Sequence, residues 1–103
     1  MLKVYYPIGK SHYRIGEASL PEEVRILARR IIKFAEEYWK RKYPANRVTL
    51  FVVGSSPYRS LMYEYLKELG FPLLNDEYGK RGFRYKSMGY GKSKIILYRG
   101  RNK

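Results

Sequence analysis

The chain has 103 residues, a net charge of +13 at pH 7 and no cysteine. A chain of this length folds as one domain around one core, and without cysteine it can hold neither a disulfide nor cysteine-ligated zinc. No stretch approaches the ~20 consecutive apolar residues of a membrane span, and the first residues do not have the layout of a signal peptide. We therefore expect a single domain over residues 1–103 in the cytoplasm (of the host, for a viral protein), with no membrane partner.

The chain begins with the pattern of two extended strands. Leu2–Pro7 alternates apolar and polar positions and is rich in residues that favour β-structure. A turn signal at residues 7–10 separates it from a second extended stretch, Ser11–Ala18.

A long amphipathic helix is predicted next. Ser19 is placed to cap it, Pro21 suits its first turn, and Glu22 can close a capping box. The apolar positions that recur at three- and four-residue spacing on one face are Val24, Leu27, Ala28, Ile31, Ala35 and Tyr38. Because Pro44 disfavours helical geometry at the residue before it, the helix should end near Tyr43.

The middle of the chain predicts a buried strand and a second helix. Val48–Val53 is a continuous apolar run rich in β-branched residues, which is typical of a strand covered on both faces. Ser56 and Pro57 then suit the cap and the first position of a helix that ends at Gly70. The predicted buried side chains of this helix are Leu61, Met62, Tyr65 and Leu69.

Three further extended stretches complete the chain. Phe71–Leu74 predicts a short strand or a splayed connection, while Phe83–Met88 and Lys94–Arg99 predict a hairpin joined by residues 89–93. The resulting order ββαβαββ indicates an α/β or α+β protein with a small mixed sheet and two helices.

The segment with the clearest functional pattern is the basic, aromatic C-terminal hairpin of residues 78–103. It carries nine of the 22 Lys and Arg residues and no Asp or Glu. Such a segment attracts polyanions, and its rings offer faces on which bases can stack. We therefore predict a site for nucleic acid, DNA or RNA, that consists of Lys80, Arg81, Phe83, Arg84, Tyr85, Lys86, Tyr90, Lys92 and Lys94. The alternative for Phe83 and Tyr85 is that they pack onto the helices.

A second candidate site is the turn before the second helix. The backbone N–H groups of Gly54, Ser55 and Ser56 could hold an anion at the helix N-terminus, with Arg59 one turn further on. The simpler interpretation is an ordinary turn and helix cap, because the sequence lacks the Gly-Lys-Ser/Thr ending of a Walker loop. No spacing of carboxylates suggests a metal site, and no catalytic residues are assigned.

The middle of the chain also resembles the second half of the GNAT acyltransferase fold. The matching stretches are residues 20–23, 27–39, 47–52 and 65–71, where that family has a Pro-Glu strand end, a long helix, a strand, and a helix that ends in a Tyr…Gly-Phe signature. The resemblance extends over roughly residues 14–99 and implies a reduced GNAT-like fold.

The GNAT family binds acetyl-CoA through a glycine-containing loop at a helix N-terminus. The corresponding stretch, Glu22–Ala28, has no glycine, and the position of the family's general-acid tyrosine is occupied by Leu66. An acetyl-CoA-dependent N-acetyltransferase is therefore the alternative function, and acetyl-CoA is expected as a cofactor only under it. An open cleft between two strands beside the N-terminus of the first helix would support that alternative.

Three functions follow from the sequence. The leading hypothesis is a non-catalytic nucleic-acid-binding protein on a reduced GNAT-like fold. The others are the acyltransferase and a structural or homo-oligomerising protein with a tyrosine-rich interface. The absence of Gln and the abundance of Lys, Arg, Glu and Ile resemble the composition of small proteins from thermophilic archaea or their viruses.

Overall fold

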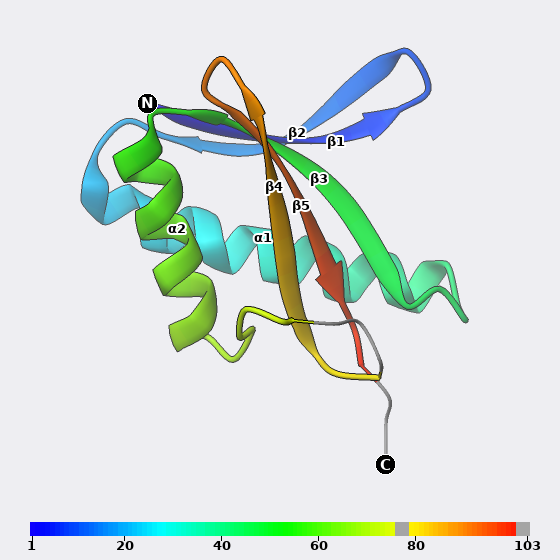
Figure 1. Ribbon diagram of the computed structural model, residues 1–103. Coiled ribbons are helices and arrows are strands. Elements are labelled where there is room, and N and C mark those ends of the chain that lie inside the picture. The colour runs from blue at the N-terminus through cyan, green and yellow to red at the C-terminus, as the bar shows by residue number, and fades with distance from the viewer. Residues whose placement is uncertain (76–78, 101–103) are drawn as a thin grey trace.

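Two hairpins and two helices build the protein, as the computed structural model shows for residues 1–75 and 79–100 (Figure 1). The elements are β1 (Leu2–Ile8), β2 (Ser11–Ala18), α1 (Pro21–Arg41), β3 (Arg47–Gly54), α2 (Ser56–Glu68), β4 (Gly82–Gly89) and β5 (Lys92–Tyr98). The predicted α+β order ββαβαββ is confirmed. Tyr78 and the last three residues of the predicted basic segment lie outside the described residues.

The strands form one five-stranded sheet in the order β2-β1-β3-β5-β4. Every neighbouring pair of strands is antiparallel. In the described part of the chain, parallel pairing occurs only as an isolated bridge between Leu73 and Phe83, so the short strand predicted at Phe71–Leu74 is reduced to this bridge. β1 lies between β2 and β3, and Leu2 is paired with both Ala18 and Gly54.

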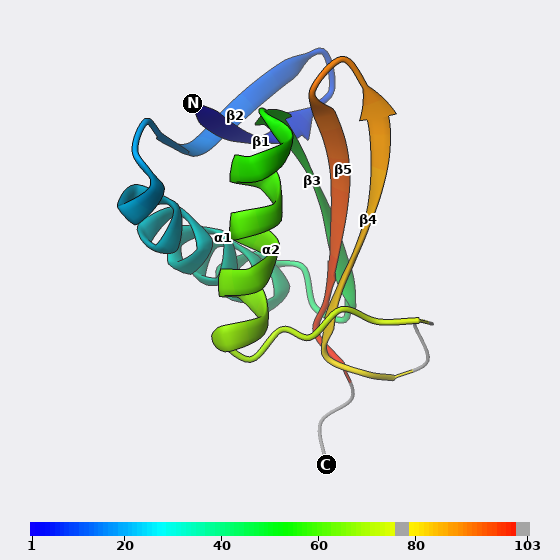
Figure 2. The same cartoon turned by 60° about the vertical axis from the view of Figure 1, so that its left-hand side comes forward.

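Both helices pack against the same face of the sheet (Figure 2). The buried strand residues on that face alternate along the chain and include Leu2, Val4, Leu50, Val52, Ile95 and Leu97. The prediction that Val48–Val53 is covered on both faces is wrong, because β3 alternates between buried and half-buried residues. The neighbours of β3 are antiparallel hairpin strands, which need no helical crossover on the second face.

Helix α1 begins one residue later than the sequence pattern indicates. Its N-cap is Leu20, and the Glu23 carboxylate accepts hydrogen bonds from the backbone N–H groups of Ser19 (2.7 Å) and Leu20 (3.0 Å). Glu23 therefore has the capping role that was predicted for Glu22. The helix approaches β2 closely at Gly16, where an added Cβ would lie 2.9 Å from the Leu27 side chain.

Helix α2 buries a different stripe of side chains from the one predicted. Met62, Tyr63 and Leu66 are buried, whereas Leu61, Tyr65 and Leu69 are only half-buried. Of the four core residues predicted for this helix, Met62 is therefore the one that is fully buried. The stripe is rotated because the Tyr63 ring stacks on β4, leaving Tyr65 beneath the Arg25 guanidinium at 4.6 Å. The N-cap is Ser55 rather than Ser56, without a side-chain cap hydrogen bond.

Candidate nucleic-acid interface

Within residues 1–75 and 79–100, no helix packs against the second face of the sheet (Figure 2). Side chains on alternate positions of a strand point to opposite faces, and directly paired residues of antiparallel strands share a face. The register therefore places on this open face Lys3 and Tyr5 of β1, Thr49, Phe51 and Val53 of β3, Lys92, Lys94 and Ile96 of β5, and Arg84 and Lys86 of β4. All of these except the exposed Lys86 are half-buried, as expected for a single uncovered layer.

A continuous row of five paired residues crosses the centre of the open face. Arg14 of β2 pairs with Tyr5, Tyr5 with Phe51, Phe51 with Lys94, and Lys94 with Lys86 of β4. Two aromatic side chains thus lie side by side in the middle of the sheet, with cationic side chains at both ends of the row.

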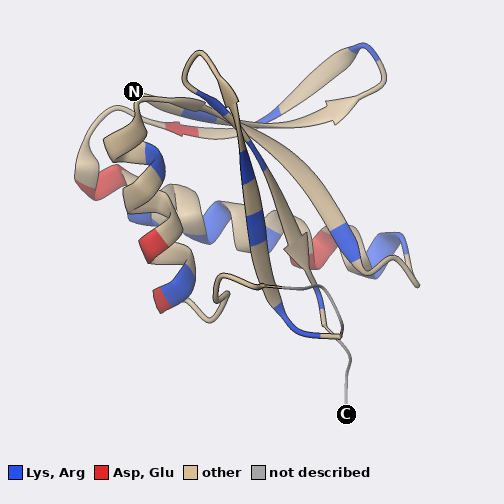
Figure 3. Ribbon diagram, in the orientation of Figure 1, with Lys and Arg blue, Asp and Glu red and all other residues tan. Residues whose placement is uncertain are grey.

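Acidic and basic residues are distributed unequally between the two layers (Figure 3). Strands β3, β4 and β5 contain five basic residues and no acidic one. Six of the nine acidic residues of the chain, in contrast, lie on the helices: Glu22, Glu23, Glu36, Glu37, Glu64 and Glu68. Strands β3, β4 and β5 therefore present positive charge, whereas in β2 the acidic Glu17 pairs with Lys3 of β1. The helical layer carries a mixture of both signs.

The two rings of the row have polar neighbours within the face. The Lys92 ammonium lies over the Phe51 ring at 4.8 Å from its centroid. The His12 ring meets Tyr5 edge-on with centroids 5.3 Å apart. Phe51 and Tyr5 are thus partly covered by side chains and are held in place without being enclosed.

Four of the nine predicted nucleic-acid-binding residues come together on the open face: Arg84, Lys86, Lys92 and Lys94. Lys80 is exposed in the connection before β4. Arg81 points toward the helical layer, because its guanidinium contacts the Glu36 carboxylate of α1 at 2.6 Å and lies over the Phe71 ring at 4.3 Å. Arg81 therefore fixes this connection to α1 and does not contribute to the open face.

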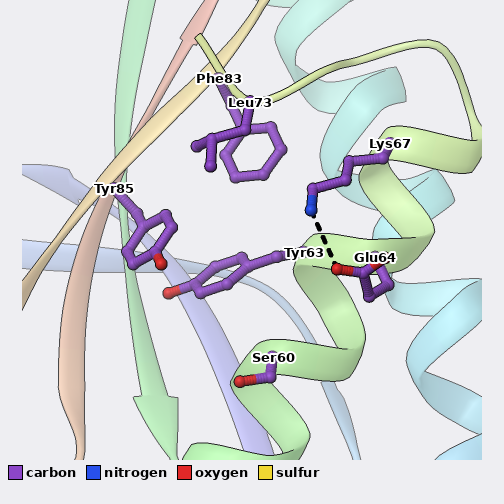
Figure 4. A pocket seen from close by; sticks show the side chains of 7 residues that line it. All are labelled: Ser60, Tyr63, Glu64, Lys67, Leu73, Phe83 and Tyr85. Carbon is purple, nitrogen blue, oxygen red and sulfur yellow. Dashed lines mark hydrogen bonds and ion pairs between the residues drawn. The ribbon is translucent and has the colours of Figure 1, made fainter. Parts of the chain in front are cut away.

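The predicted stacking residues Phe83 and Tyr85 lie on the other face of the sheet (Figure 4). Phe83 is fully buried, and Tyr85 stacks on Tyr63 of α2 with ring centroids 4.3 Å apart. The alternative interpretation, packing onto the helices, therefore holds for Phe83, whereas Tyr85 packs on Tyr63 and is still 47% exposed. A pocket of about 110 Å³ lies beside these rings, which is well below the ~300 Å³ at which ligand pockets usually begin.

The Tyr63 hydroxyl is buried in this layer and has no hydrogen-bond partner of good geometry among the described residues, although the Ser93 hydroxyl and the Arg59 guanidinium lie near it and favour its phenolate. Burial raises the pKa of Tyr63 above its ordinary value of 10.0, because the charged phenolate is poorly solvated there.

The remaining predicted ring, Tyr90, projects from the tip of the β4–β5 hairpin. It is fully exposed and has a left-handed backbone conformation (φ 54°) between two glycines that also have positive φ. The predicted five-residue connection at residues 89–93 shortens to the turn between Gly89 and Lys92, because these two residues pair. Tyr90 thus lies outside the row of paired residues on the open face.

Lys3, Tyr5 and Phe51 were not predicted from the sequence as site residues. Their signal was present in β1, where Lys3 and Tyr5 alternate with the buried Leu2 and Val4. It was hidden in β3, because Phe51 stands in an uninterrupted apolar run in which either face could have been the covered one.

The arginine of the candidate anion-binding turn before α2, Arg59, makes hydrogen bonds within the fold. The Arg59 guanidinium donates to the Gly54 carbonyl at 3.0 Å and to the buried Ser93 hydroxyl at 2.5 Å. The Gly54 N–H donates to the Gly91 carbonyl, so this turn also ties α2 to the β4–β5 hairpin. These contacts support the simpler interpretation of residues Gly54, Ser55, Ser56 and Arg59 as a turn and cap, with Ser55 and Ser56 exposed.

A wide hollow of about 700 Å³ lies at the C-terminal end of α1. Its lining consists of Glu36, Trp39, Lys40, Tyr43, Arg81 and Arg99. Arg81 is paired with Glu36, and Arg99 lies 5.9 Å from the Tyr43 ring, so both guanidinium groups have contacts within the fold. The hollow is separate from the row on the open face and shares no residue with it.

Comparison with known proteins gives no relative: no family model, no curated protein and no solved structure matches this chain. Within the described residues, no group of three or more His, Cys, Asp or Glu side chains could hold a metal ion. Neither helix in the described part of the chain is both long and apolar enough to cross a membrane.

Proposed function

We propose that this protein binds nucleic acid through the open face of its sheet and that it does so without catalysis. The observation that carries the proposal is the in-register pairing of Lys86 with Lys94, with Lys92 next to Lys94 on the same face. Like charges directly opposite each other destabilise a sheet, so an arrangement of this kind is costly unless an anion neutralises it. A phosphate backbone supplies that anion in a repeating form. The proposal includes a cytoplasmic setting.

The acyltransferase alternative is less well supported by the geometry. It requires an open cleft between the strand that precedes α1 and the strand that follows it. These are β2 and β3, and β1 lies between them with pairing to both. Beside the N-terminus of α1 the gap is thus filled by Leu2, which is fully buried.

The oligomerisation alternative has one observation in its favour, an aromatic cluster between the β1–β2 hairpin and α1. Tyr13 stacks on Phe34 at 5.9 Å, and Tyr6 contacts the same ring at 5.2 Å. Tyr13 is about half exposed, at 53%, and Ile8 beside it likewise. These rings pack mainly against one another within the chain, so we place this function second.

A salt titration with matched charge variants tests the proposal. Lys3, Lys86, Lys92 and Lys94 can meet about four phosphates, so the slope of log K against log salt should be roughly −3 to −4. Replacing Lys86, Lys92 and Lys94 together by Ala should flatten this slope by about 2 to 3 and weaken binding to every sequence. Fluorescence anisotropy with short labelled strands and duplexes measures both quantities.

The control is a triple variant with the same change in net charge on the helical layer. Arg29, Lys33 and Lys40 are exposed residues of α1, and their replacement by Ala should leave most of the slope unchanged. Equal losses in the two triple variants would show that overall charge, and not the open face, governs binding. No binding at ~50 mM salt, where electrostatic binding is strong, would reject nucleic acid as the partner. Size-exclusion chromatography of the same samples would then show whether the chain self-associates.

A further inference from the structure

We infer that the preferred ligand of the open face is a single strand, whose bases stack on Tyr5 and Phe51. This inference rests on the proposed function and specifies its substrate class. The two residues are direct cross-strand partners on β1 and β3, the first and second of the inner strands after the β2 edge. Neither of them belongs to the basic C-terminal hairpin.

The two rings belong to side chains that are close neighbours on the open face. Paired residues on neighbouring antiparallel strands have Cβ atoms ~4.5–5.5 Å apart, so the Tyr5 and Phe51 side chains leave the sheet next to each other on the open face. A base has a π-face whatever its identity, and stacking on such surfaces is therefore tolerant of sequence. The surface can receive bases only if they have been freed from their neighbours, since in a duplex both faces of each base are already stacked.

Cationic side chains lie on both sides of the two rings. Within the central row, Lys94 and Lys86 follow Phe51 on one side, and Arg14 follows Tyr5 on the other. Arg14 forms an ion pair with Glu17 at 3.5 Å, but both side chains are about half exposed, and such surface pairs contribute little. A strand whose bases lie on the two rings would thus find cations for its phosphates at either end of the row.

Lys92 lies at the Phe51 ring, with its ammonium 4.8 Å from the ring centroid. A base that stacks on Phe51 would take this place. Lys92 has a flexible side chain with three donors, so it can turn from the ring to a phosphate of the same strand. In the free protein, this face of the Phe51 ring is thus covered by a flexible side chain.

The test compares a labelled oligothymidine strand with a hairpin duplex of similar length at one salt concentration. The wild-type protein should bind the strand at least about 10-fold more tightly. Phe51→Leu and Tyr5→Leu should each weaken strand binding by about 5- to 100-fold, the equivalent of one stacked base, and should change duplex binding less than about 2-fold. Tyr5→Phe and Phe51→Tyr keep a ring and should retain strand binding.

The matched control is Tyr13→Leu, which removes a strand tyrosine that faces the helical layer and is 53% exposed. It should leave strand binding unchanged, and the salt slope should stay the same in all the ring variants. Photocrosslinking of wild-type protein to a strand that carries a photoreactive thymine does not depend on the folding of any variant. Crosslinks should map to Tyr5 or Phe51.

The possible failures can be told apart. Equal wild-type affinity for strand and duplex, together with a loss in the triple lysine variant, would leave the proposed function standing and overturn the stacking inference. Crosslinks confined to Tyr85 or Tyr90 would overturn it too. An absence of binding to both ligands would overturn the proposed function itself.

Discussion

At the scale of single residues, the buried Tyr63 hydroxyl is an unsatisfied polar group inside the layer that supports the open face. It makes no hydrogen bond within the described residues, and the side chain is only 7% exposed. Removing such a hydroxyl avoids a desolvation cost of ~1–3 kcal/mol. We therefore expect Tyr63→Phe to raise the free energy of unfolding by about 1 kcal/mol at neutral pH, measured by urea denaturation.

The same residue predicts a dependence of stability on alkaline pH. Because burial raises the pKa of Tyr63 in the folded protein, the folded state holds its proton at pH values where the unfolded state has lost it. This contribution to stability is complete below pH 10 and is lost as the pH rises further, toward the raised folded-state pKa. The stability advantage of Tyr63→Phe should therefore widen above pH 10.

The control for this prediction is Tyr90→Phe, which removes a hydroxyl that is fully exposed at the tip of the hairpin. The difference between this variant and the wild type should stay constant over the same pH range. A constant difference for Tyr63→Phe as well would mean that the Tyr63 hydroxyl is solvated in the folded protein.

At the scale of elements, the start of α1 depends on one carboxylate. Glu23 accepts hydrogen bonds from the backbone N–H groups of Ser19 and Leu20 at the helix start, whereas Glu22 is exposed and makes no such bond within the described residues. Replacing Glu23 by Ala should lower the free energy of unfolding by about 1–2 kcal/mol, as the loss of a helix cap does. Glu22→Ala removes the same charge from the same turn and should cost no more than about 0.5 kcal/mol. Chemical denaturation of the two variants decides between them, and equal losses would assign the effect to the helix dipole alone.

Local patterns in the sequence were sufficient for the elements but not for their assembly. Turn residues, alternation and helical spacing predicted the order ββαβαββ, because each of these signals is contained in a few neighbouring residues. The position of β1 between β2 and β3 depends on pairing between segments some fifty residues apart, as between Leu2 and Gly54, and no local pattern encodes it. The faces of β3 depend on that same pairing.

The candidate site was predictable in its charges and not in its rings. Lys86, Lys92 and Lys94 belong to a hairpin whose lack of acidic residues is visible in the sequence. Phe83 and Tyr85 have the same aromatic character as Phe51 and Tyr5, and only the packing of α2 against β4 places the first two on the helical face and leaves the other two on the open face. Composition cannot make that distinction, since burial and binding both select aromatic residues.

At the scale of the whole molecule, the positive charge of the open face links stability to binding. The uncovered layer holds lysines that repel one another, and salt screens this repulsion. Salt should therefore raise the melting temperature of the free protein while it weakens the complex. The triple Ala variant of Lys86, Lys92 and Lys94 should be at least as stable as the wild type when free, because stability and function oppose each other at these positions.

Thermal melting with and without a short strand tests this link directly. A ligand at ten times its Kd stabilises the folded state by about 1.4 kcal/mol, which corresponds to a rise of roughly 6–10 °C in the melting temperature of a chain of this size. At low salt, we expect such a rise for the wild type and for the control variant with Ala at Arg29, Lys33 and Lys40. At high salt, the rise should disappear in both. The triple variant of the open face should show a much smaller rise, even at low salt. A rise that persists undiminished in this variant would place the contact with the phosphates on another surface of the protein.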